Sequence, residues 1–599
     1  DGSLFPMSGV NNREQVSEQV DKQKESGSPD QISRPWNLRR VQIWSFVGFL
    51  LVAFAWSVRR VDLSFSGIIE IVEGWPATWS LLKRMVPPSL PSEDIDLIIS
   101  LSLDTFFMAF AGTAVGLVLG IPLGLLSARN VMPWASVRAL SRAIIVFSRA
   151  IPALVFAIFF VRIYGIGVLP GILAIGIHSI GMIGKLTADA AEDIDIGPRE
   201  GVTSTGAGPM QDLATGVWSQ MVPTVITISL YRLEIDFRSA PILGWVGAGG
   251  IGVLLRSYQG GLRYQEMLGI TLLIVVLVIL LEALCAVTRN ALLGTTERLP
   301  KNLKTKSIFA SFVSPGQKIA DLIINRSGRK KTQGEQSTES RLTAPWTVER
   351  IKVNTVSTIF SVLLVLSFII PDIGAKEILT DSGNIPEMLR RLTPDNWSWW
   401  SSRILSDLID TVGIGMAATG LALLFAIPFS FLAASNTAPG RFVYLCSRLF
   451  MLVVRCVPEL VVAVIFVAAI GPGPRAGTLA LSIGMFGFVT KLFADAIEEA
   501  RQGIRDGVVS TGSTRLQEST TAVLPQVVTS MISNSMYLLD VAIRSSTVVG
   551  IVGGGGIGFL VVNSARQLQW DTLGGIIFCI FVIVYAIELL ATWVRRKVE

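Results

Sequence analysis

Long apolar runs separated by short polar stretches dominate this chain of 599 residues. A helix needs about 20 apolar residues to cross a bilayer, so each long run is a candidate span. In the first half the runs cover 41–58, 99–127, 139–161, 170–188, 217–245 and 266–288. In the second half they cover 351–370, 405–433, 444–470, 476–494, 523–550 and 573–594. The pattern predicts an all-α polytopic membrane protein with about 12 spans.

The composition agrees with the hydrophobic pattern. Hydrophobic residues make up 51% of the chain and charged residues only 16%, against roughly 25% charged residues in soluble domains. The net charge of +6 fits basic loops beside a membrane better than a nucleic-acid partner, and we expect no such partner. The four cysteines have no CxxC spacing and the chain has one histidine, His178, so we expect no metal site. No GxxxxGK[ST] motif occurs; any ATP and Mg must therefore be bound by another chain.

The two halves of the chain repeat each other at a constant offset of 306 (410 − 104). Asp104-Thr105 matches Asp410-Thr411, and VGAGGIG at 246–252 matches VGGGGIG at 552–558, with no gap between these matches. Six spans per half would give both halves the same orientation. We therefore expect two parallel six-helix repeats with a shared path at their interface.

Charge and composition predict the boundaries of the repeats. Residues 1–40 are polar and are expected to form a disordered tail. Residues 41–290 form the first repeat, 291–350 a basic linker and 351–599 the second repeat. Basic residues precede the first span, fill the linker and end the chain. The bias of Lys and Arg toward cytoplasmic loops places the tail, the linker and both termini in the cytoplasm.

A polar stretch interrupts each half between its fourth and fifth span. The first reads ADAAEDIDIGPREGVTSTGA at 188–207, and the second ADAIEEARQGIRDGVVSTGS at 494–513. Each contains an acidic residue, a glycine, a valine, three further residues and a second glycine. A short helix ended by a glycine, which tolerates a left-handed backbone, would make a compact knob that transmits rigid-body motion. A plain solvated loop is the alternative.

The paired stretches resemble the EAA loop of ABC-importer permeases, which forms a short cytoplasmic coupling helix in a cleft of the ATPase subunit. The resemblance implies the type I ABC importer transmembrane fold. It assigns coupling to Glu200, Gly201, Gly206, Asp506, Gly507 and Gly512. The first copy departs from the pattern, because Trp218-Ser219 stands where the second has Leu524-Pro525. This departure leaves open whether the two following helices begin alike and contact the ATPase equally.

Further segments resemble the permease of phosphonate importers, the PhnE family. They are IHSIGMIGKLTADAAEDID (177–195), YRLEIDFRSAPILGWVGAGGIG (231–252), RAIPALVFAIFFV (149–161) and RCVPELVVAVIFV (455–467). The likeness covers about 100–290 and 405–595, as if two permease units were fused. The second copy diverges more, with Gly484 in place of His178 and Leu538 in place of Arg232.

The resemblance implies a transmembrane permease subunit of an ATP-driven importer for phosphonate, or for the related phosphate or phosphite. The chain would have no catalytic residues and no cofactor of its own. A cytoplasmic ABC ATPase dimer would bind ATP and Mg, and an extracellular or periplasmic phosphonate-binding protein would deliver the anion. The location implied is the plasma (inner) membrane, with multiple passes through the lipid bilayer.

Ionisable residues inside predicted spans are candidates for the substrate path. Arg149 has no acidic residue within four positions, and Arg455 has only Glu459, which follows Pro458, so both arginines could bind an anion or cap a helix break at the nearby prolines. Glu234 and Asp540 each precede an arginine by four residues, which also suits an intrahelical ion pair. A core histidine is the alternative for His178. The candidate path comprises Arg149, Arg455, His178, Arg238, Arg544, Glu234 and Asp540.

Two other classes of protein fit parts of the pattern. A secondary transporter for a small anion could be built from parallel repeats and driven by an ion gradient. An anion channel is a further alternative. Neither class explains why the polar loop occurs twice, so the importer permease is the favoured interpretation.

Overall fold

The computed structural model describes residues 48, 52–63, 69, 75–293, 348–370, 382–394 and 400–598, and these are helical with no strand among them. Residues 1–53 form one unit and residues 54–599 a second; the account below concerns the second. The predicted tail 1–40 and nearly all of the linker 291–350 lie outside the described residues.

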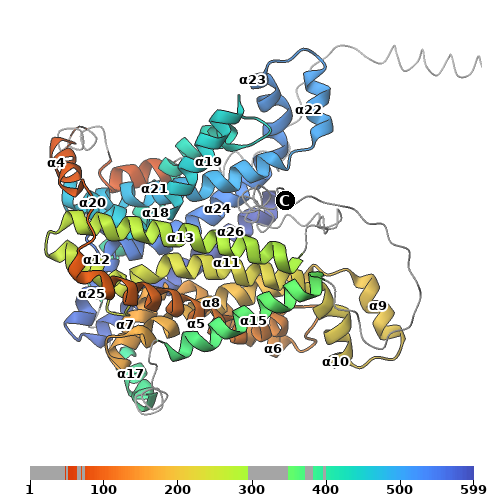
Figure 1. Ribbon diagram of the computed structural model, residues 1–599, viewed down its shortest axis with the longest axis horizontal. Helices are drawn as coiled ribbons and strands as arrows, with labels where there is room; N and C mark the ends of the chain where they lie inside the picture. Colours follow the sequence, from red (N-terminus) through yellow and green to blue (C-terminus); the bar gives the residue numbers. More distant parts are fainter. Residues whose placement is uncertain are drawn as a thin grey trace, which may run out of the picture. The chain divides into compact units, whose positions relative to one another are not determined.

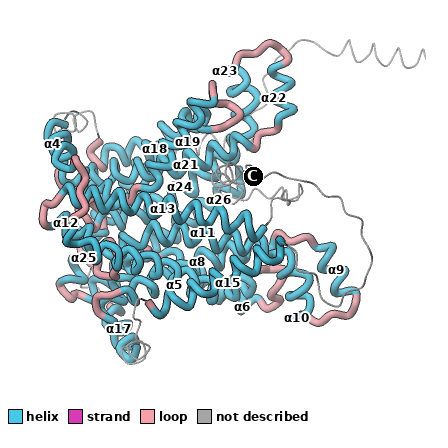
Figure 2. Tube along the Cα trace, in the orientation of Figure 1, coloured by secondary structure: helices cyan, strands magenta, loops and turns pink. Residues whose placement is uncertain are grey.

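The first repeat contains a series of helices whose order Figures 1 and 2 show. Their bounds are α4 Trp75–Met85, η1 Ser92–Asp94, α5 Ile95–Ser127, α6 Ala135–Ala150, α7 Ala153–Tyr164, α8 Val168–Glu192, α9 Ile196–Ser204, α10 Pro209–Gln211, η2 Asp212–Val217, α11 Trp218–Gly244, α12 Gly252–Gly260 and α13 Tyr264–Leu293.

The second repeat contains the corresponding helices. Their bounds are α15 Val348–Ile369, η4 Ser382–Asn384, α17 Ile385–Leu392, α18 Ser402–Ala433, α19 Arg441–Cys456, α20 Glu459–Ile470, α21 Pro474–Glu498, α22 Gln502–Val509, α23 Arg515–Glu518, η6 Ser519–Val523, α24 Leu524–Gly550, α25 Gly558–Arg566 and α26 Trp570–Val598. From α6/α19 to α13/α26, most matched helices begin 306 residues apart, as 441 − 135 and 570 − 264 show. The sequence repeat is therefore a structural repeat.

The number of spans differs from the prediction of about 12. Within the described residues seven helices are long and apolar enough to cross a membrane, or nine if each bent helix pair is one span. Of the other three predicted runs, 41–58 lies mainly outside the described part of the chain. The run 351–370 is helical but apolar only over Thr358–Ile369. The run 523–550 forms α24, which carries ionisable residues and is not among the nine.

The third predicted run of each repeat, 139–161 and 444–470, is bent at the proline where the sequence allows a helix break. Helices α6 and α7 meet at 87°, and α19 and α20 meet at 81°. Pro152 and Pro458 stand immediately before the second helix of each pair. Proline lacks a backbone N–H and disfavours the helical conformation of the residue before it, which explains the break.

Helices α5 and α8 form the closest pair of the first repeat, and glycine makes their approach possible. Every fourth residue of α5 facing α8 is a glycine. A Cβ on Gly116 would lie 2.5 Å from the Cβ of Ser179, and one on Gly124 would lie 2.6 Å from the carbonyl oxygen of Gly184. Small residues spaced by four let two membrane helices pack backbone to backbone. The equivalent positions of α18 are the buried Ala418, Ala422, Ala426 and Ser430.

The first helix of each repeat packs on the other repeat. Helix α15 lies against α5 and α13, with the ring of Phe360 5.5 Å from that of Phe110. In the first repeat, the helical residues 54–60 take the position equivalent to α15. The ring of Phe54 covers Gly420 of α18, and Arg60 pairs with Asp410 at 2.7 Å. The two phenylalanines are again 306 residues apart (360 − 54). Each repeat is thus completed by a helix that the sequence places in the other.

Candidate functional site

The two polar stretches form short exposed helices, α9 and α22, at one end of the long helices (Figure 1). Each helix is followed by a glycine with a positive φ, +81° at Gly206 and +79° at Gly512. No atom lies within 4 Å of the Cβ that either residue would carry. Conformation rather than packing therefore requires glycine at these positions. The other expected coupling residues are exposed as well: Glu200, Gly201, Asp506 and Gly507.

An arginine joins each short helix to the turn that follows it. Arg199 of α9 pairs with Asp212 at 2.8 Å, and Arg505 of α22 donates to Glu518 at 2.8 Å. Hydrogen bonds between charged partners are stronger and more directional than neutral ones. Neither arginine was among the residues predicted from the sequence, although the two occupy equivalent positions in the two loops.

The same arginines also donate hydrogen bonds to the segment that connects α5 to α6 in the first repeat and α18 to α19 in the second. Arg199 donates to the carbonyl oxygen of Asn130 at 2.7 Å, and the Asn130 amide donates to the carbonyl of Ala191 at the end of α8. Arg505 donates in the same way to the carbonyl of Asn436 at 2.6 Å. Each short helix is therefore connected by hydrogen bonds to its helical bundle.

The helices that follow the loops begin alike, despite Trp-Ser in one copy and Leu-Pro in the other. A π-helical turn precedes both α11 and α24. Gln220 accepts a hydrogen bond from the Asp195 backbone at 3.1 Å, and Gln526 accepts one from the Arg501 backbone at 3.0 Å. The sequence difference does not change how the loop returns to the bundle.

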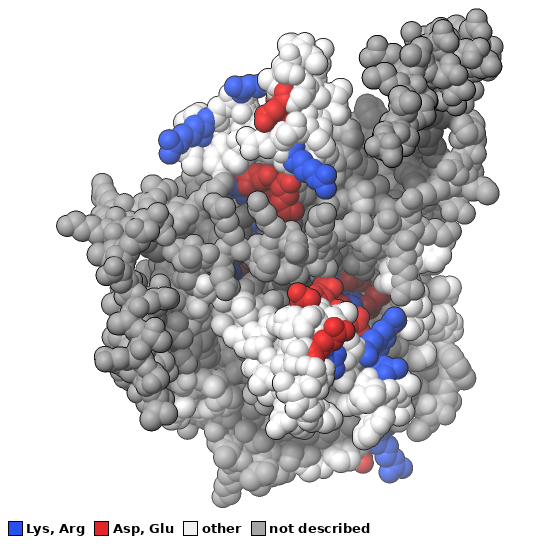
Figure 3. All heavy atoms as spheres, turned by 90° about the vertical axis from the view of Figure 1, so that its right-hand side faces the viewer, with Lys and Arg blue, Asp and Glu red and all other residues white. Residues whose placement is uncertain are grey.

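Acidic residues gather where each loop leaves its long helix. Burial, together with the charges of Asp189 and Glu192, raises the pKa of the Asp193 carboxyl. At the equivalent position burial and the charge of Asp495 raise the pKa of Glu499. Figure 3 shows acidic and basic side chains together on the described atoms of the face that carries both loops.

The half-buried arginines near the ends of α6 and α19 each pair with a carboxylate of the other repeat. Nη2 of Arg455 lies 3.1 Å from Oε1 of Glu282 on α13, and Arg149 pairs with Glu588 on α26. The two pairs are related by the repeat, since 588 − 282 and 455 − 149 both equal 306. Both carboxylates were absent from the sequence-based candidates. They lie 173 and 439 residues from their arginines, so local spacing carried no signal.

The intrahelical ion pair, the alternative to a role in the substrate path, forms in only one repeat. Arg544 pairs with Asp540 at 2.6 Å in α24. In α11 it does not form, because Glu234 faces Arg289 of α13 at 3.6 Å. Among the described residues Arg238 has no ion pair, and its buried Nε has no hydrogen-bond partner. The equivalent arginines therefore have different surroundings.

His178 occupies the helix break of the first repeat. Its Nδ1 lies 3.1 Å from the carbonyl oxygen of Ile151, so the ring has a hydrogen-bond partner at the break. In the second repeat Gly484 takes this position, and a Cβ there would come 2.8 Å from Cγ of Glu459. The space of the histidine ring is thus used by a glutamate from the neighbouring helix.

A buried polar network in the first repeat also escaped the sequence analysis. Arg232 pairs with Asp236 at 2.6 Å. Ser179 and Thr113 donate to the same carboxylate at 2.8 and 2.9 Å. All four side chains are buried. The second repeat replaces three of them with Leu538, Ala542 and Met485. The network makes the two halves chemically unequal.

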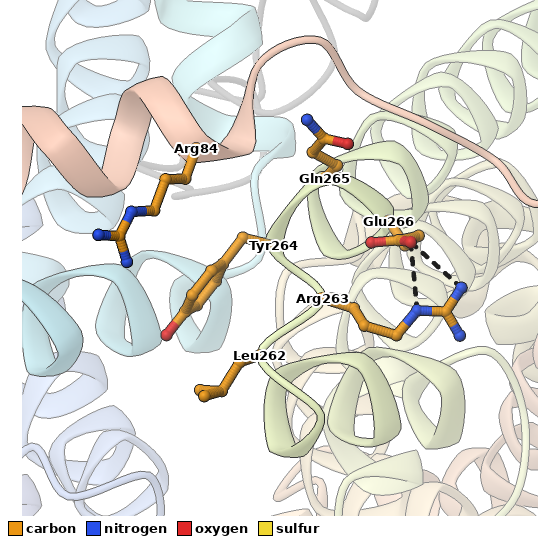
Figure 4. A pocket seen from close by; sticks show the side chains of 6 residues that line it. All are labelled: Arg84, Leu262, Arg263, Tyr264, Gln265 and Glu266. Atoms are coloured by element: carbon orange, nitrogen blue, oxygen red, sulfur yellow. Dashed lines mark hydrogen bonds and ion pairs between the residues drawn. The ribbon is translucent and has the colours of Figure 1, made fainter.

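An open hollow of about 330 Å³ lies at the opposite end of the helices from α9, between α4 and the start of α13. Figure 4 shows its lining residues, Arg84, Leu262, Arg263, Tyr264, Gln265 and Glu266. Arg263 pairs with Glu266 at 3.1 Å. None of the candidate path residues lines this hollow. The described residues also include no group of three or more His, Cys, Asp or Glu suited to a metal ion.

Comparison with known proteins identifies the repeated unit. Residues 120–291 and 426–599 each match the family described as binding-protein-dependent transport system inner membrane component. The phosphate-import permease protein PhnE of Mycolicibacterium smegmatis is 38% identical over 546 residues, covering 91% of this chain and 92% of that protein. The phosphite transport system permease protein PtxC of Stutzerimonas stutzeri is 35% identical over 255 residues, covering 43% of this chain and 90% of that protein.

A chain of the inward-facing MetNI methionine ABC transporter is 17% identical, with a TM-score of 0.30, and the match covers 33% of this chain and 100% of that chain. The two family matches show that this multi-pass membrane protein is an all-helical permease in which two units of the type I ABC importer fold are fused. The chain belongs to the family of binding-protein-dependent transport system inner membrane components.

Proposed function

We propose that this chain is the transmembrane permease subunit of an ATP-driven importer for phosphorus oxyanions, namely phosphonate, phosphate or phosphite. The observation that carries the coupling to ATP is the pair of exposed helices α9 and α22, each ended by a glycine with a positive φ. A cytoplasmic ABC ATPase dimer, which binds ATP and Mg, docks on these two helices. ATP-driven closure of the dimer draws them together and opens the path outward.

Exposed apolar side chains beside these helices support a docking surface. Met210 is 79% exposed and Leu516, its equivalent (516 − 210 = 306), is 75% exposed. A single exposed apolar residue is ordinary on a protein surface. Met210 and Leu516, however, occupy equivalent positions, and each lies beside a short helix that an arginine–carboxylate pair holds in place. This arrangement suits a partner that contacts both loops.

The substrate class rests on relatives and on charge. The relatives above are named for phosphate and phosphite, and the segments quoted earlier resemble phosphonate permeases. Buried arginines at the interface of the repeats are the groups that would accompany an anion through a membrane. An external binding protein delivers the anion at the far ends of the helices. The Lys and Arg bias supports cytoplasmic termini, and the family match supports a location in the inner membrane.

The test reconstitutes the chain in lipid vesicles with its ATPase and binding protein and measures ATP hydrolysis and uptake. Inorganic phosphate, methylphosphonate and phosphite are supplied in turn. Stimulation of ATP hydrolysis by one of these anions is expected, and the anion that stimulates it identifies the transported substrate. The double variant Gly206→Pro, Gly512→Pro should abolish the stimulation, because proline requires a negative φ and removes the N–H that bonds to the carbonyl of Thr203.

Single variants of each glycine serve as controls, since they show whether the two loops contribute equally. Uptake driven by an ion gradient without any ATPase would overturn the importer and favour a secondary transporter for a small anion. ATP-driven uptake of a different anion would keep the coupling and overturn the substrate class.

A further inference from the structure

Arg238 of α11 differs from its equivalent in a way that points to a ligand. Its Nε is buried and has no hydrogen-bond partner in the described part of the chain. Arg544 instead pairs with Asp540 at 2.6 Å and donates to the carbonyl oxygen of Arg149 at 3.2 Å. A buried guanidinium is costly unless its charge and its hydrogen bonds are satisfied. Arg544 therefore has partners for its charge and its donors, whereas Nε of Arg238 has none in the described part of the chain.

Two more open polar atoms belong to the side chains beside Arg238. Nε of Arg455 and Oε2 of Glu282 are buried without partners among the described residues, although the two side chains pair through their other atoms. Arg238 interacts electrostatically with both. Their helices also meet, because α13 packs against α11 and against α19. The three residues, named here the Arg238 cluster, offer two hydrogen-bond donors and one acceptor.

This combination suits one kind of anion. Phosphate and phosphonate at neutral pH include forms that carry acceptor oxygens together with a P–OH donor. Sulfate at that pH has acceptor oxygens only. Two other carboxylates, both of α11, are already paired: Glu234 with Arg289 at 3.6 Å and Asp236 with Arg232 at 2.6 Å. The carboxyl of Glu459 near Arg238 is hydrogen-bonded to Ser545.

We propose that Arg238, Arg455 and Glu282 form a transient binding site for a singly protonated phosphorus oxyanion within the membrane path. The two arginine Nε atoms donate to its charged oxygens, and Oε2 of Glu282 accepts its P–OH proton in a hydrogen bond. This inference rests on the proposed function and deepens it. It assigns selection against sulfate to the permease itself.

The equivalent cluster of the other repeat does not form a second site. Arg149, Glu588, Arg544 and Asp540 include no buried polar atom without a partner in the described structure. Their charges are satisfied by one another. The chain therefore binds one anion, off the axis that relates the repeats.

The experiment measures binding of inorganic phosphate and of sulfate to the purified full chain in lipid nanodiscs, by isothermal titration and by the shift of the melting temperature. The wild type should bind phosphate and not sulfate. Arg238→Gln should weaken phosphate binding by at least about tenfold, the effect expected from one charged hydrogen bond. Glu282→Gln adds a donor at the carboxyl position and should relax the preference for phosphate over sulfate.

The control is the double variant Glu387→Gln, Arg391→Gln, which neutralises an exposed ion pair of α17 at 3.1 Å, outside the candidate path, and should leave phosphate binding as in the wild type. Melting curves without anion show that each variant is folded. Unchanged phosphate binding in Arg238→Gln, equal loss in the control, or no phosphate binding by the wild type would overturn the site. Phosphate uptake by the reconstituted importer in any of these cases would leave the proposed function standing.

Discussion

Glu282 of α13 and Arg455 of α19 lie 3.1 Å apart, although 173 residues separate them along the chain. With Arg149 and Glu588 they form two reciprocal ion pairs, in which each repeat supplies one arginine and one carboxylate. A buried ion pair adds little net stability, but removing one partner leaves an uncompensated charge. The pairs therefore favour one alignment of the two repeats over others.

Replacing one member of the Arg149–Glu588 pair should destabilise the protein. Glu588→Gln leaves a buried guanidinium without its counter-charge, at a cost of about 3–5 kcal/mol. The melting temperature in detergent should fall. The double variant Arg149→Gln, Glu588→Gln removes both charges and should recover most of the loss. Equal melting temperatures for the single and double variants would contradict the pairing.

Alanine should have opposite effects at Gly201 and Gly206 of the first loop. Gly201 lies within α9 with no atom within 4 Å of an added Cβ, so Gly201→Ala should stabilise this helix by about 0.5–1 kcal/mol. Gly206 has a φ of +81°, so Gly206→Ala should cost about 1–2 kcal/mol. Amide hydrogen exchange in α9 measures both changes. If both substitutions changed the stability of α9 in the same direction, the loop would not need a residue with a left-handed backbone at position 206.

The arginines of the loops should matter for coupling rather than for assembly. Arg199→Gln breaks the contact with Asp212 at 2.8 Å and loosens α9 from its bundle. With the ATPase present, we expect copurification to persist while substrate-stimulated hydrolysis falls several-fold, roughly the effect of losing 1–2 kcal/mol of charged hydrogen bonding. Arg505→Gln is the matched variant in the second loop. Full stimulation in the double variant would rule out the connection as part of coupling.

The glycine face of α5 should tolerate no side chain. Gly116→Ala would place a Cβ 2.5 Å from the Cβ of Ser179, and the resulting overpacking should cost about 1–3 kcal/mol. The control is Gly260→Ala in α12, where nothing lies within 4 Å of the new Cβ. Thermal unfolding in detergent compares the two. A melting temperature as low in the control as in Gly116→Ala would show that the loss does not arise from the α5–α8 contact.

Features that depend on nearby residues could be read from the sequence. Most apolar runs and the two loops follow from patterns within tens of residues, and the repeat follows from comparing such patterns 306 positions apart. The left-handed glycines were expected at Gly206 and Gly512 because helix termination is decided by a few neighbouring dihedral angles. The ion pair of Asp540 with Arg544 was also foreseeable, since residues four apart share a helix face.

Packing between distant segments decided the rest. Spacing alone suggested that Glu234 would pair with Arg238, but the fold brings Arg289 to the glutamate instead. Likewise Glu282 and Glu588 became partners of buried arginines only because the two repeats meet face to face. A sequence specifies which charges a helix carries and on which side. Which charge lies opposite depends on how helices from both repeats pack, and that is determined only when the whole chain folds.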